Sequence, residues 1–313
     1  MSETKISYQP LREIARKTTI IESPRLSNLL GVDLTVASET FQYTGSFKFR
    51  AAYNVAVNVD QKEIITASSG NFGQALAYSC LLLGKRCTVV MPETSARVKI
   101  DAVREYGATA DLINVKEKGR EERVAELVQQ SPEAYKASAY NDPLVIEGNA
   151  SLGEELAQQS KTFDYIISPI GGGGLSSGII KGLRRAGSPA QVFAAEPLMA
   201  NDAARSLREG RIVRNETEPQ TIADGARTVS VGNHNWEILR QGLAGIVEVP
   251  EDKIKEAVRL YFSLVNLKVE PTGALSLAAV LVQPETFRSR RVCCVVSGGN
   301  VDTDVYKSIL SGS

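Results

Sequence analysis

The sequence predicts an α/β fold of two domains, each built on a mostly parallel sheet flanked by helices. Short apolar strands alternate with helices over residues 60–130, with short connections between them. This order is typical of parallel strands joined by crossover helices. The alternation resumes at residue 164, and a chain of 313 residues is long enough for two domains.

The N-terminal part contributes a helix and a strand before the first alternation. Residues 1–22 are expected to form a leader helix, which the pair Ser23-Pro24 ends. Apolar and polar residues alternate over 32–36, which predicts a strand. The stretch Tyr43-Thr44-Gly45-Ser46-Phe47-Lys48-Phe49-Arg50 then opens an apolar, helix-like run at 51–56.

The first alternation is predicted from apolar runs and from the turn residues between them. We expect strands at 63–67, 86–91 and 110–115, and helices at 75–83, 95–106 and 120–130. Gly84 follows its helix directly, which is the usual place of a C′ glycine.

The second alternation follows the same logic over the rest of the chain. We expect strands at 164–170, 192–195 and 291–296, and helices at 175–185, 251–267 and 275–282. The segment 205–235 has the least regular pattern, and we expect it to be loop-rich surface close to a site.

Charge and composition exclude several classes of function. Lys+Arg and Asp+Glu both number 36, so no basic surplus points to nucleic acid or membrane binding. The N-terminus lacks the apolar core of a signal peptide, and no apolar run approaches a membrane span. The four cysteines form no CxxC pair. A cytoplasmic, reduced protein is therefore expected.

His234 is the single histidine of the chain. A His-rich zinc site is therefore excluded, and a Ser-His-Asp triad would have to use His234, which has no nucleophile elbow nearby. An enzyme with a single histidine is expected to take its chemistry from a cofactor.

Lys48 is the candidate nucleophile. It lies between two phenylalanines and opens an apolar run. Burial disfavours the charged ammonium, lowers its pKa and makes the amine available for a Schiff base. The alternative interpretation is an ordinary surface lysine on a helix.

Three predicted strands end in turns rich in Gly or Ser, at 68–74, 171–174 and 297–300. Ligands of open α/β sheets bind at the carboxyl ends of the strands. The four glycines at 171–174 precede a helix, where backbone N–H groups and the helix dipole hold phosphate. The sequence fits neither a Walker A loop nor GxGxxG with its acidic partner. The alternative is a tight turn between strand and helix.

The other two turns and one pair of acids are also candidate binding groups. The turn at 68–74 suits a carboxylate ligand, unless it is only a helix cap by Ser69. The Ser297 hydroxyl could bind a ring nitrogen without forcing its protonation. Glu196 and Asp202, with a loop carbonyl between them, suit a hard cation. The alternative is a pair of solvated surface acids.

The ordered set of motifs resembles the fold-type II pyridoxal-phosphate enzymes, a tryptophan synthase β-like fold, and within them the branch of serine/threonine dehydratases and serine racemases. The resemblance spans about residues 20–305. The motifs that carry it are Ser46-Phe47-Lys48-Phe49-Arg50-Ala51-Ala52, Ser68-Ser69-Gly70-Asn71-Phe72-Gly73-Gln74, Gly171-Gly172-Gly173-Gly174, Thr221-Ile222-Ala223-Asp224-Gly225, Glu270-Pro271-Thr272-Gly273 and Ser297-Gly298-Gly299-Asn300.

The resemblance implies a role for each candidate residue. Lys48 binds pyridoxal 5′-phosphate as a Schiff base and moves the Cα proton, and Ser69 is the acid/base on the opposite face. The cofactor contacts are implied at Phe47, Lys48, Asn71, Gly171, Gly172, Gly173, Gly174 and Ser297. The substrate contacts are implied at Ser68, Ser69, Gly70, Asn71 and Phe72. A divalent cation, Mg or Ca, is implied at Glu196, the Ala200 carbonyl and Asp202.

The resemblance also implies the organisation of the chain. A large domain of residues 1–38 and 141–313 is expected to carry an inserted small domain, 39–140, with the cofactor between them. A homodimer is implied, and so is closure of the small domain over a small amino-acid substrate. The C-terminal regulatory domain of biosynthetic threonine dehydratases is expected to be absent.

Two stretches depart from the family pattern. Phe72 stands where the family usually has His, and Glu147-Gly148-Asn149-Ala150-Ser151 replaces a stretch near AGQGT. Both departures concern the expected pocket for the substrate side chain, so they bear on substrate preference more than on the chemistry.

The expected activity is dehydration of an L-β-hydroxy amino acid of the serine or threonine type to a 2-oxo acid and ammonia. The alternatives are serine-type racemisation, dehydration of 3-hydroxyaspartate, and, more remotely, β-replacement or phosphate-ligand binding without catalysis. A 3-hydroxyaspartate enzyme needs a cation for the second carboxylate, for which Arg120 and Arg227 are candidates.

Overall fold

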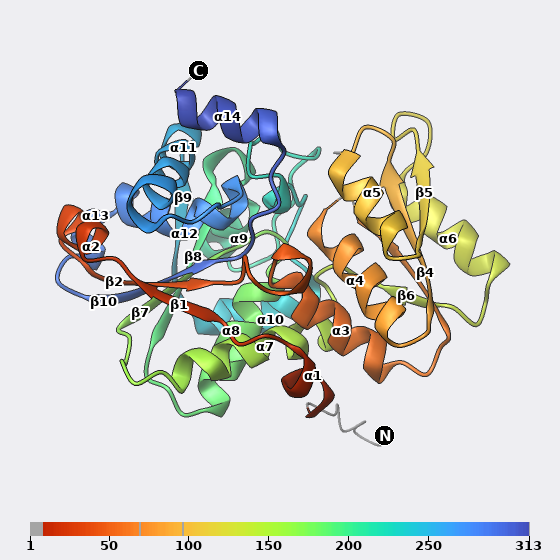
Figure 1. The fold of residues 1–313 in the computed structure, drawn as a ribbon, viewed down its shortest axis with the longest axis horizontal. Coiled ribbons are helices and arrows are strands. Elements are labelled where there is room, and N and C mark those ends of the chain that lie inside the picture. Colours follow the sequence, from red (N-terminus) through yellow and green to blue (C-terminus); the bar gives the residue numbers. More distant parts are fainter. Residues whose placement is uncertain (1–8, 69, 96, 313) are drawn as a thin grey trace.

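The computed structural model describes residues 9–68, 70–95 and 97–312, and it contains two sheets (Figure 1). The larger sheet has six strands in the order β1-β2-β10-β7-β8-β9, and the smaller has four in the order β5-β4-β3-β6. All strand pairs are parallel except β1 with β2. The predicted class, α/β with mostly parallel sheets flanked by helices, is confirmed.

The smaller sheet is covered on both faces, as parallel sheets generally are. Its strands are β3 (Glu63–Ala67), β4 (Arg86–Pro92), β5 (Thr109–Ile113) and β6 (Tyr135–Ala137). Its helices are α4 (Asn71–Leu82), α5 (Arg97–Glu105) and α6 (Arg120–Gln130). Ile64 and Val89 face the α4 side, whereas Ile65 and Val90 pack with Val124 of α6. The period of two along each strand produces this division.

The larger sheet is also enclosed by two helical layers. Its strands are β1 (Thr19–Glu22), β2 (Asp33–Ser38), β7 (Tyr165–Pro169), β8 (Gln191–Pro197), β9 (Leu243–Val249) and β10 (Arg291–Val296). One face packs against α2 (Pro24–Leu30), α11 (Glu251–Leu260) and α12 (Pro271–Val282). The other packs against α7 (Pro143–Ala157), α8 (Gly174–Arg185) and α10 (Asn233–Gly242). Cys293 and Cys294 of β10 face opposite layers, which explains why both are buried.

Helix α3 (Lys48–Asn58) joins the two sheets, because it packs on α7 of the large layer and on α4 of the small one. The contact with α7 is close: a Cβ on Gly148 would lie 2.4 Å from the carbonyl oxygen of Arg50. The Asn54 side chain donates to the Leu144 carbonyl at 2.8 Å. The residue that opens α3 is therefore held between the sheets.

Several predicted elements have their expected bounds. The strands 63–67 and 291–296 and the helix 120–130 agree residue for residue. Apart from the leader helix, whose residues 1–8 lie outside the described part of the chain, the other predicted strands and helices through 185 differ only at their ends. Gly84 has a left-handed φ of +63°, as a C′ glycine should. The domain boundaries at 38/39 and 140/141 stay a prediction.

The leader-helix prediction is wrong beyond residue 14. Among the described residues, α1 covers only Gln9–Ile14, and residues 19–22 form β1. The β-branched run Thr18-Thr19-Ile20-Ile21 favours a strand over a helix. Ser23-Pro24 begins a helix that was not predicted: the Ser23 hydroxyl accepts from the Leu26 N–H, and Pro24 occupies the first helical position.

The segment 205–235 is mainly loop, as predicted. Its helical parts are the end of α9 (Asp202–Glu209), the 3-10 turn Asp224–Ala226 and the start of α10. Another prediction needs correction: the helix predicted at 251–267 leaves α geometry after Leu260, where a π turn over 261–265 ends at Asn266 with a φ of 55°. Further elements not predicted from the sequence are β6, α7, α9, β9, α10, α13 (Pro284–Phe287) and α14 (Thr303–Ser311).

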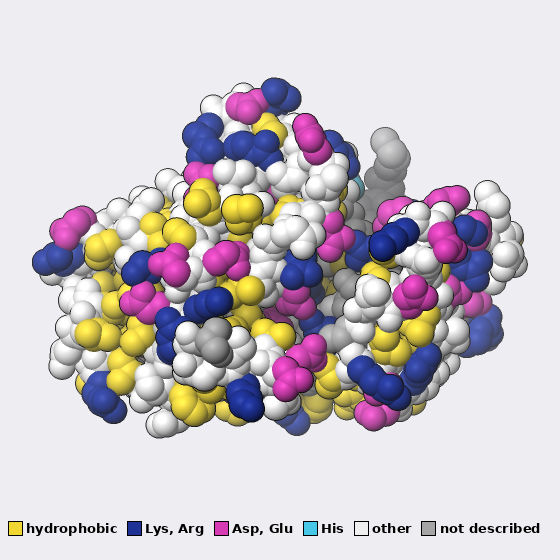
Figure 2. Space-filling view, turned by 90° about the horizontal axis from the view of Figure 1, so that it is seen from above, with side chains coloured by type: hydrophobic (Ala, Val, Ile, Leu, Met, Phe, Trp, Pro, Cys, Tyr) yellow, Lys and Arg dark blue, Asp and Glu magenta, His cyan; other side chains and the backbone are white. Residues whose placement is uncertain are grey.

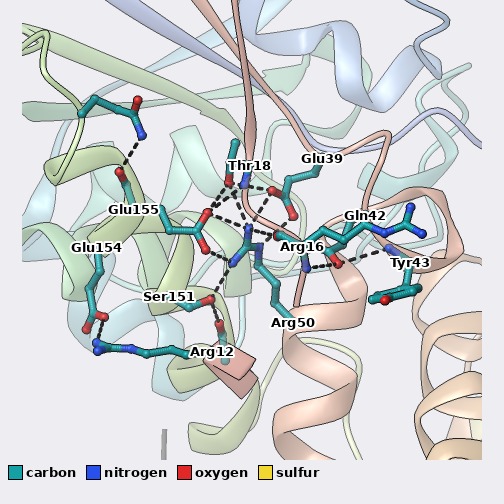
Figure 3. A network of polar contacts seen from close by, with 12 residues as sticks. Arg12, Arg16, Thr18, Glu39, Gln42, Tyr43, Arg50, Ser151, Glu154 and Glu155 are labelled. Atoms are coloured by element: carbon teal, nitrogen blue, oxygen red, sulfur yellow. Dashed lines mark hydrogen bonds and ion pairs between the residues drawn. The ribbon is translucent and has the colours of Figure 1, made fainter. Parts of the chain in front are cut away.

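A buried ionic network fixes the start of α3 (Figure 3). The Arg50 guanidinium is fully buried, and it donates to both carboxylate oxygens of Glu39 and to both of Glu155 at 2.8 to 3.0 Å. It also donates to the hydroxyls of Ser151 and Thr18. The network connects α3 with the end of β2, with α7 and with the segment before β1.

In Figure 2 the acidic and basic side chains are intermixed over the visible face, in keeping with 36 residues of each sign. Across residues 9–68, 70–95 and 97–312, no helix has both the length and the hydropathy that crossing a membrane requires.

We predict that Arg50→Met lowers the free energy of unfolding by about 3–5 kcal/mol, because it leaves the fully buried carboxylate of Glu39 and the partly buried one of Glu155 without their cation. Urea unfolding of the purified variant measures this change. The matched control is Arg86→Met, since Arg86 pairs with Glu63 at 2.8 Å but its side chain is 75% exposed, and it should cost about 1 kcal/mol or less. Equal losses in the two variants would contradict the prediction.

Candidate active site

The backbone before Lys48 is held by the end of β10. Thr44 and Gly45 have left-handed φ values of 59° and 72°. A β-bridge joins Ser46 to Gly298, and the Phe47 N–H donates to the Ser297 carbonyl at 2.9 Å. The lysine therefore opens α3 directly beside the turn that follows β10.

The Lys48 side chain lies among aromatic rings and a backbone carbonyl. Its Nζ donates to the Ala139 carbonyl at 3.0 Å and lies 4.9 Å from the centre of the Phe47 ring and 5.9 Å from that of Phe72. Burial lowers the pKa of Lys48 to about 8, and the nearby Glu270 carboxylate opposes part of this shift. A substantial fraction of the amine is therefore uncharged near neutral pH.

The glycine loop, residues 171–174, connects β7 to α8 and lies against Tyr140. A Cβ on Gly172 would meet the Tyr140 ring at 2.1 Å, and Gly173 has a φ of +94°. Both positions therefore require glycine. The Asn235 amide donates to the carbonyls of Gly172 and Tyr140, at 2.6 and 3.0 Å.

This arrangement brings the glycine loop next to the lysine, since Tyr140 directly follows Ala139, the acceptor of Lys48 Nζ. The first N–H groups of α8 have no partner inside their own helix. They form a site for an anion, supported by the helix dipole.

The turn after β3 supplies a second set of donors at the start of α4. The Ser68 hydroxyl accepts from the N–H groups of Gly70 and Gly73, at 3.4 and 3.0 Å. The capping role considered for Ser69 is thus met by Ser68, and Ser69 itself lies outside the described residues. Phe72 is buried with an exposure of 1%, so this departure from the family pattern lies in the wall beside Lys48.

Asn71 is bound on both sides by protein groups. Its amide N–H donates to both Glu270 oxygens, at 2.9 and 3.1 Å, and its carbonyl accepts from the Asn300 amide at 2.9 Å. Asn300 also donates to the Thr44 carbonyl at 2.7 Å. Asn71 of the small layer is thereby connected to the turns on either side of Lys48.

The structure thus brings together Phe47, Lys48, Asn71, Phe72, the glycine loop and Ser297, which come from distant parts of the chain. It does not place the stretch 147–151 in a loop at this site. That stretch lies inside α7, where Asn149 donates to the Gly174 carbonyl at 3.0 Å and Ser151 accepts from Arg50. The single histidine, His234, is exposed at the start of α10.

Glu270, Lys99 and Asp224 are three ionisable residues at the site to which the sequence analysis gave no role. Glu270 is 2% exposed, and burial and Asp224 raise its pKa to about 7. Lys99 forms an ion pair with Asp224. Burial alone would lower the pKa of Lys99, but the carboxylates of Asp224 and Glu270 have the larger combined effect and raise it. Asp224 and Glu270 lie inside two of the motifs that carry the family resemblance, and this location was the signal in the sequence that could have identified them as site residues.

Glu196 and Asp202 lie together at the end of β8 and the start of α9. Each is 1% exposed, so the interpretation as solvated surface acids is wrong. Glu196 accepts from the N–H groups of Ala203 and Ala204, and Asp202 Oδ1 accepts from Asn215. Burial raises the pKa of both acids, that of Asp202 to about 7. Asp202 Oδ2 is buried without a partner in the described part of the chain.

The residues fit pyridoxal phosphate, as two observations of this structure indicate. The anion cradle requires glycine at Gly172 and Gly173, and the Lys48 amine has a lowered pKa. A carbonyl compound that carries a phosphate could react with the Lys48 amine and bind its phosphate at the glycine loop.

We predict that the Lys48 amine in the cofactor-free protein reacts with acetic anhydride with a midpoint near pH 8. Below its pKa the ammonium is unreactive, and exposed lysines, with a pKa of about 10.4, respond at higher pH. Peptide mass spectrometry after brief labelling measures each site. Glu270→Gln should lower the Lys48 midpoint, because it removes the carboxylate that favours the ammonium. A midpoint near pH 10 would contradict the environment described.

Comparison with known proteins agrees with this geometry. Residues 11–298 match the family model described as pyridoxal-phosphate dependent enzyme. The chain is 35% identical to the serine racemase of Dictyostelium discoideum, over 99% of this chain and 98% of that protein. It is 35% identical to the L-threo-3-hydroxyaspartate ammonia-lyase of a Pseudomonas species, over 96% and 95%.

A solved structure extends the similarity to three dimensions. The T.th. threonine deaminase superposes with a TM-score of 0.89 at 38% identity, over 94% of this chain and 96% of that one. The resemblance inferred from the motifs is confirmed, and the chain belongs to the family of pyridoxal-phosphate dependent enzymes.

Proposed function

We propose that this enzyme is an ammonia-lyase that dehydrates an L-β-hydroxy amino acid of the serine or threonine type to a 2-oxo acid and ammonia. The observation that carries the proposal is the Lys48 amine, whose pKa is lowered to about 8 beside a glycine cradle for phosphate. Relatives named threonine deaminase and hydroxyaspartate ammonia-lyase support the reaction class.

Each part of the site has a separate task in this reaction. The N–H groups of the glycine loop hold the phosphate, Phe47 packs on the ring, and Asn71 and Ser297 contact its edge. The turn at 68–72 binds the substrate carboxylate. The bound cofactor supplies an electron-accepting ring that takes up the charge left when the Cα proton departs.

Lys48 moves the proton. Its amine is the base that removes the Cα proton, and its lowered pKa makes a larger fraction of the amine uncharged near neutral pH than in an exposed lysine. The neutral hydroxyl of Ser297 leaves the ring nitrogen unprotonated, which favours prompt loss of the β-hydroxyl group over slower side reactions. Phe72 narrows the space beside Lys48 and excludes water from it.

Racemisation of serine is the second candidate, favoured by the similarity to proteins named serine racemase. It would use Ser69 as the acid/base on the opposite face. A third candidate is dehydration of 3-hydroxyaspartate, for which a relative is named. The two arginines considered for its second carboxylate are otherwise engaged: Arg120 pairs with Glu218 at 2.9 Å, and Arg227 donates to the Thr221 carbonyl.

We also propose a divalent cation at Glu196, Asp202 and the Ala200 carbonyl. The buried, unpartnered Asp202 Oδ2 supports it, because two buried carboxylates without a cation are costly. No cluster of three or more His, Cys, Asp or Glu suited to a metal occurs within 9–68, 70–95 and 97–312, so the carbonyl would be an essential ligand. The two-domain division with the cofactor between, the homodimer and the cytoplasmic location stay predictions.

The substrate is tested with the holoenzyme and a panel of L- and D-serine, L-threonine, threo- and erythro-3-hydroxyaspartate and phenylserine. We expect 2-oxo acid release from a β-hydroxy amino acid of the L series. Lys48→Ala should lose both the visible absorbance of the bound cofactor and all turnover.

Three outcomes separate the candidates. Release of 2-oxo acid from L-serine or L-threonine supports the proposal, and preference for threo-3-hydroxyaspartate would replace its substrate. Conversion of L- to D-serine without 2-oxo acid, seen by chiral chromatography, would favour the racemase. Full activity of Lys48→Ala would contradict the assignment altogether.

A further inference from the structure

Glu270 is a buried carboxyl group at the centre of the candidate site to which the proposed reaction gives no task. It precedes α12 as its N-cap residue and points across the space between the layers to Asn71. A Cβ on Gly298 would lie 2.7 Å from Glu270 Oε1 and 2.9 Å from the Ser46 Cβ. The carboxyl therefore lies among the turn after Ser297, the residues before Lys48 and the start of α4.

The contacts of Asn71 place Glu270 beside the proposed cofactor site. Both Glu270 oxygens accept from the Asn71 amide nitrogen, and Asn300 occupies the Asn71 carbonyl. The two oxygens belong to one carboxyl group, so they take one of the two N–H groups of Asn71 and leave the other for the ring hydroxyl. The Glu270 carboxylate would then lie one amide group away from the ring oxygen, and an ionised carboxylate there would face the negative charge of that oxygen.

The charges that face Glu270 come from every element packed around it. They are Lys48 of α3, Lys99 of α5 and Asp224 of the 3-10 helix Asp224–Ala226, beside the neutral Asn71 of α4. Lys99 is already paired with Asp224. The phosphate and ring oxygen of a bound cofactor add negative charge to this enclosed space, with Lys48 as the nearest remaining cation.

We propose that Glu270 is a positioning residue that takes up a proton when the cofactor ring and phosphate bind, and that the neutral carboxyl group keeps holding Asn71 while the second Asn71 N–H donates to the ring hydroxyl. The proton comes from solvent and forms an O–H bond on the Glu270 carboxylate. No other bond is made or broken. The inference rests on the proposed function, because it uses the same cofactor site.

Glu270 is suited to this change near neutral pH. Burial and the Asp224 carboxylate raise its pKa from 4.5 to about 7 in the cofactor-free protein. It is therefore mostly ionised at pH 8 before binding, and the negative charges of a bound cofactor in this buried space would raise its pKa further, towards protonation.

The test is calorimetry of 4′-deoxypyridoxine 5′-phosphate binding to the cofactor-free protein at pH 8, in two buffers of different ionisation enthalpy. This probe carries the ring and the phosphate but has no aldehyde to react with Lys48. The difference between the buffers gives the protons taken up. We expect the wild type to take up about one proton more than Glu270→Gln.

Glu251→Gln is the matched control. The Glu251 carboxylate binds the Ile222 N–H at 2.9 Å, two residues before Asp224, but has no contact with Asn71 among the described residues. Its proton count should equal that of the wild type. Glu270→Ala provides a second variant if Glu270→Gln does not fold, and it should show the same reduced count.

Thermal unfolding of the cofactor-free protein gives an independent readout. A carboxyl group whose folded pKa is raised binds more protons in the folded state, so its contribution to stability falls as pH rises from about 4.5 to about 7. The wild type should therefore lose more of its melting temperature between pH 5 and pH 8 than Glu270→Gln does.

The outcomes separate this inference from the proposed function. Equal proton counts for wild type and Glu270→Gln, with 2-oxo acid release intact in the wild type, would overturn the role of Glu270 alone. Failure of the probe to bind the wild type would overturn both the cofactor site and this inference.

Discussion

The buried contact of Arg50 with Glu39 and Glu155 is the constraint on which the site depends most. The guanidinium and the Glu39 carboxylate are fully buried, and the Glu155 carboxylate is 24% exposed, so removal of the guanidinium would leave Glu39 with an unpaired buried charge. Arg50 lies two residues after Lys48 on the first turn of α3. The network therefore fixes the direction in which the lysine enters the space between the two sheets.

A second set of charges surrounds the lysine itself. Glu270 and Asp224 are carboxyl groups, and Lys48 and Lys99 are amines, in one enclosed region. Burial lowers the pKa of Lys48 and raises that of Glu270, so both groups titrate near neutral pH. The structure thereby holds an amine of lowered pKa and a carboxyl group able to accept a proton within one site, while the glycine loop and α8 supply the positive end for an anion.

The sequence was sufficient for the fold class, for most strands and for the grouping of the main motifs, because period and turn residues are local properties. Lys48, the glycine loop and Ser297 could be found as ends of apolar runs. The network of Arg50 could not, because its partners are up to 105 residues away and nothing local marks Glu155 as a partner of Arg50. The β1 strand was missed although its β-branched run is a local signal, whereas nothing local distinguishes helix α7.

The central claim is that Lys48 is the residue that binds the cofactor covalently. The most direct test is reduction of the holoenzyme with borohydride, followed by peptide mass spectrometry, which locates the pyridoxyl group on the residue that carried the cofactor. The account predicts the modification at Lys48 and no other lysine. Modification at Lys99, or at no lysine in a protein saturated with cofactor, would contradict it.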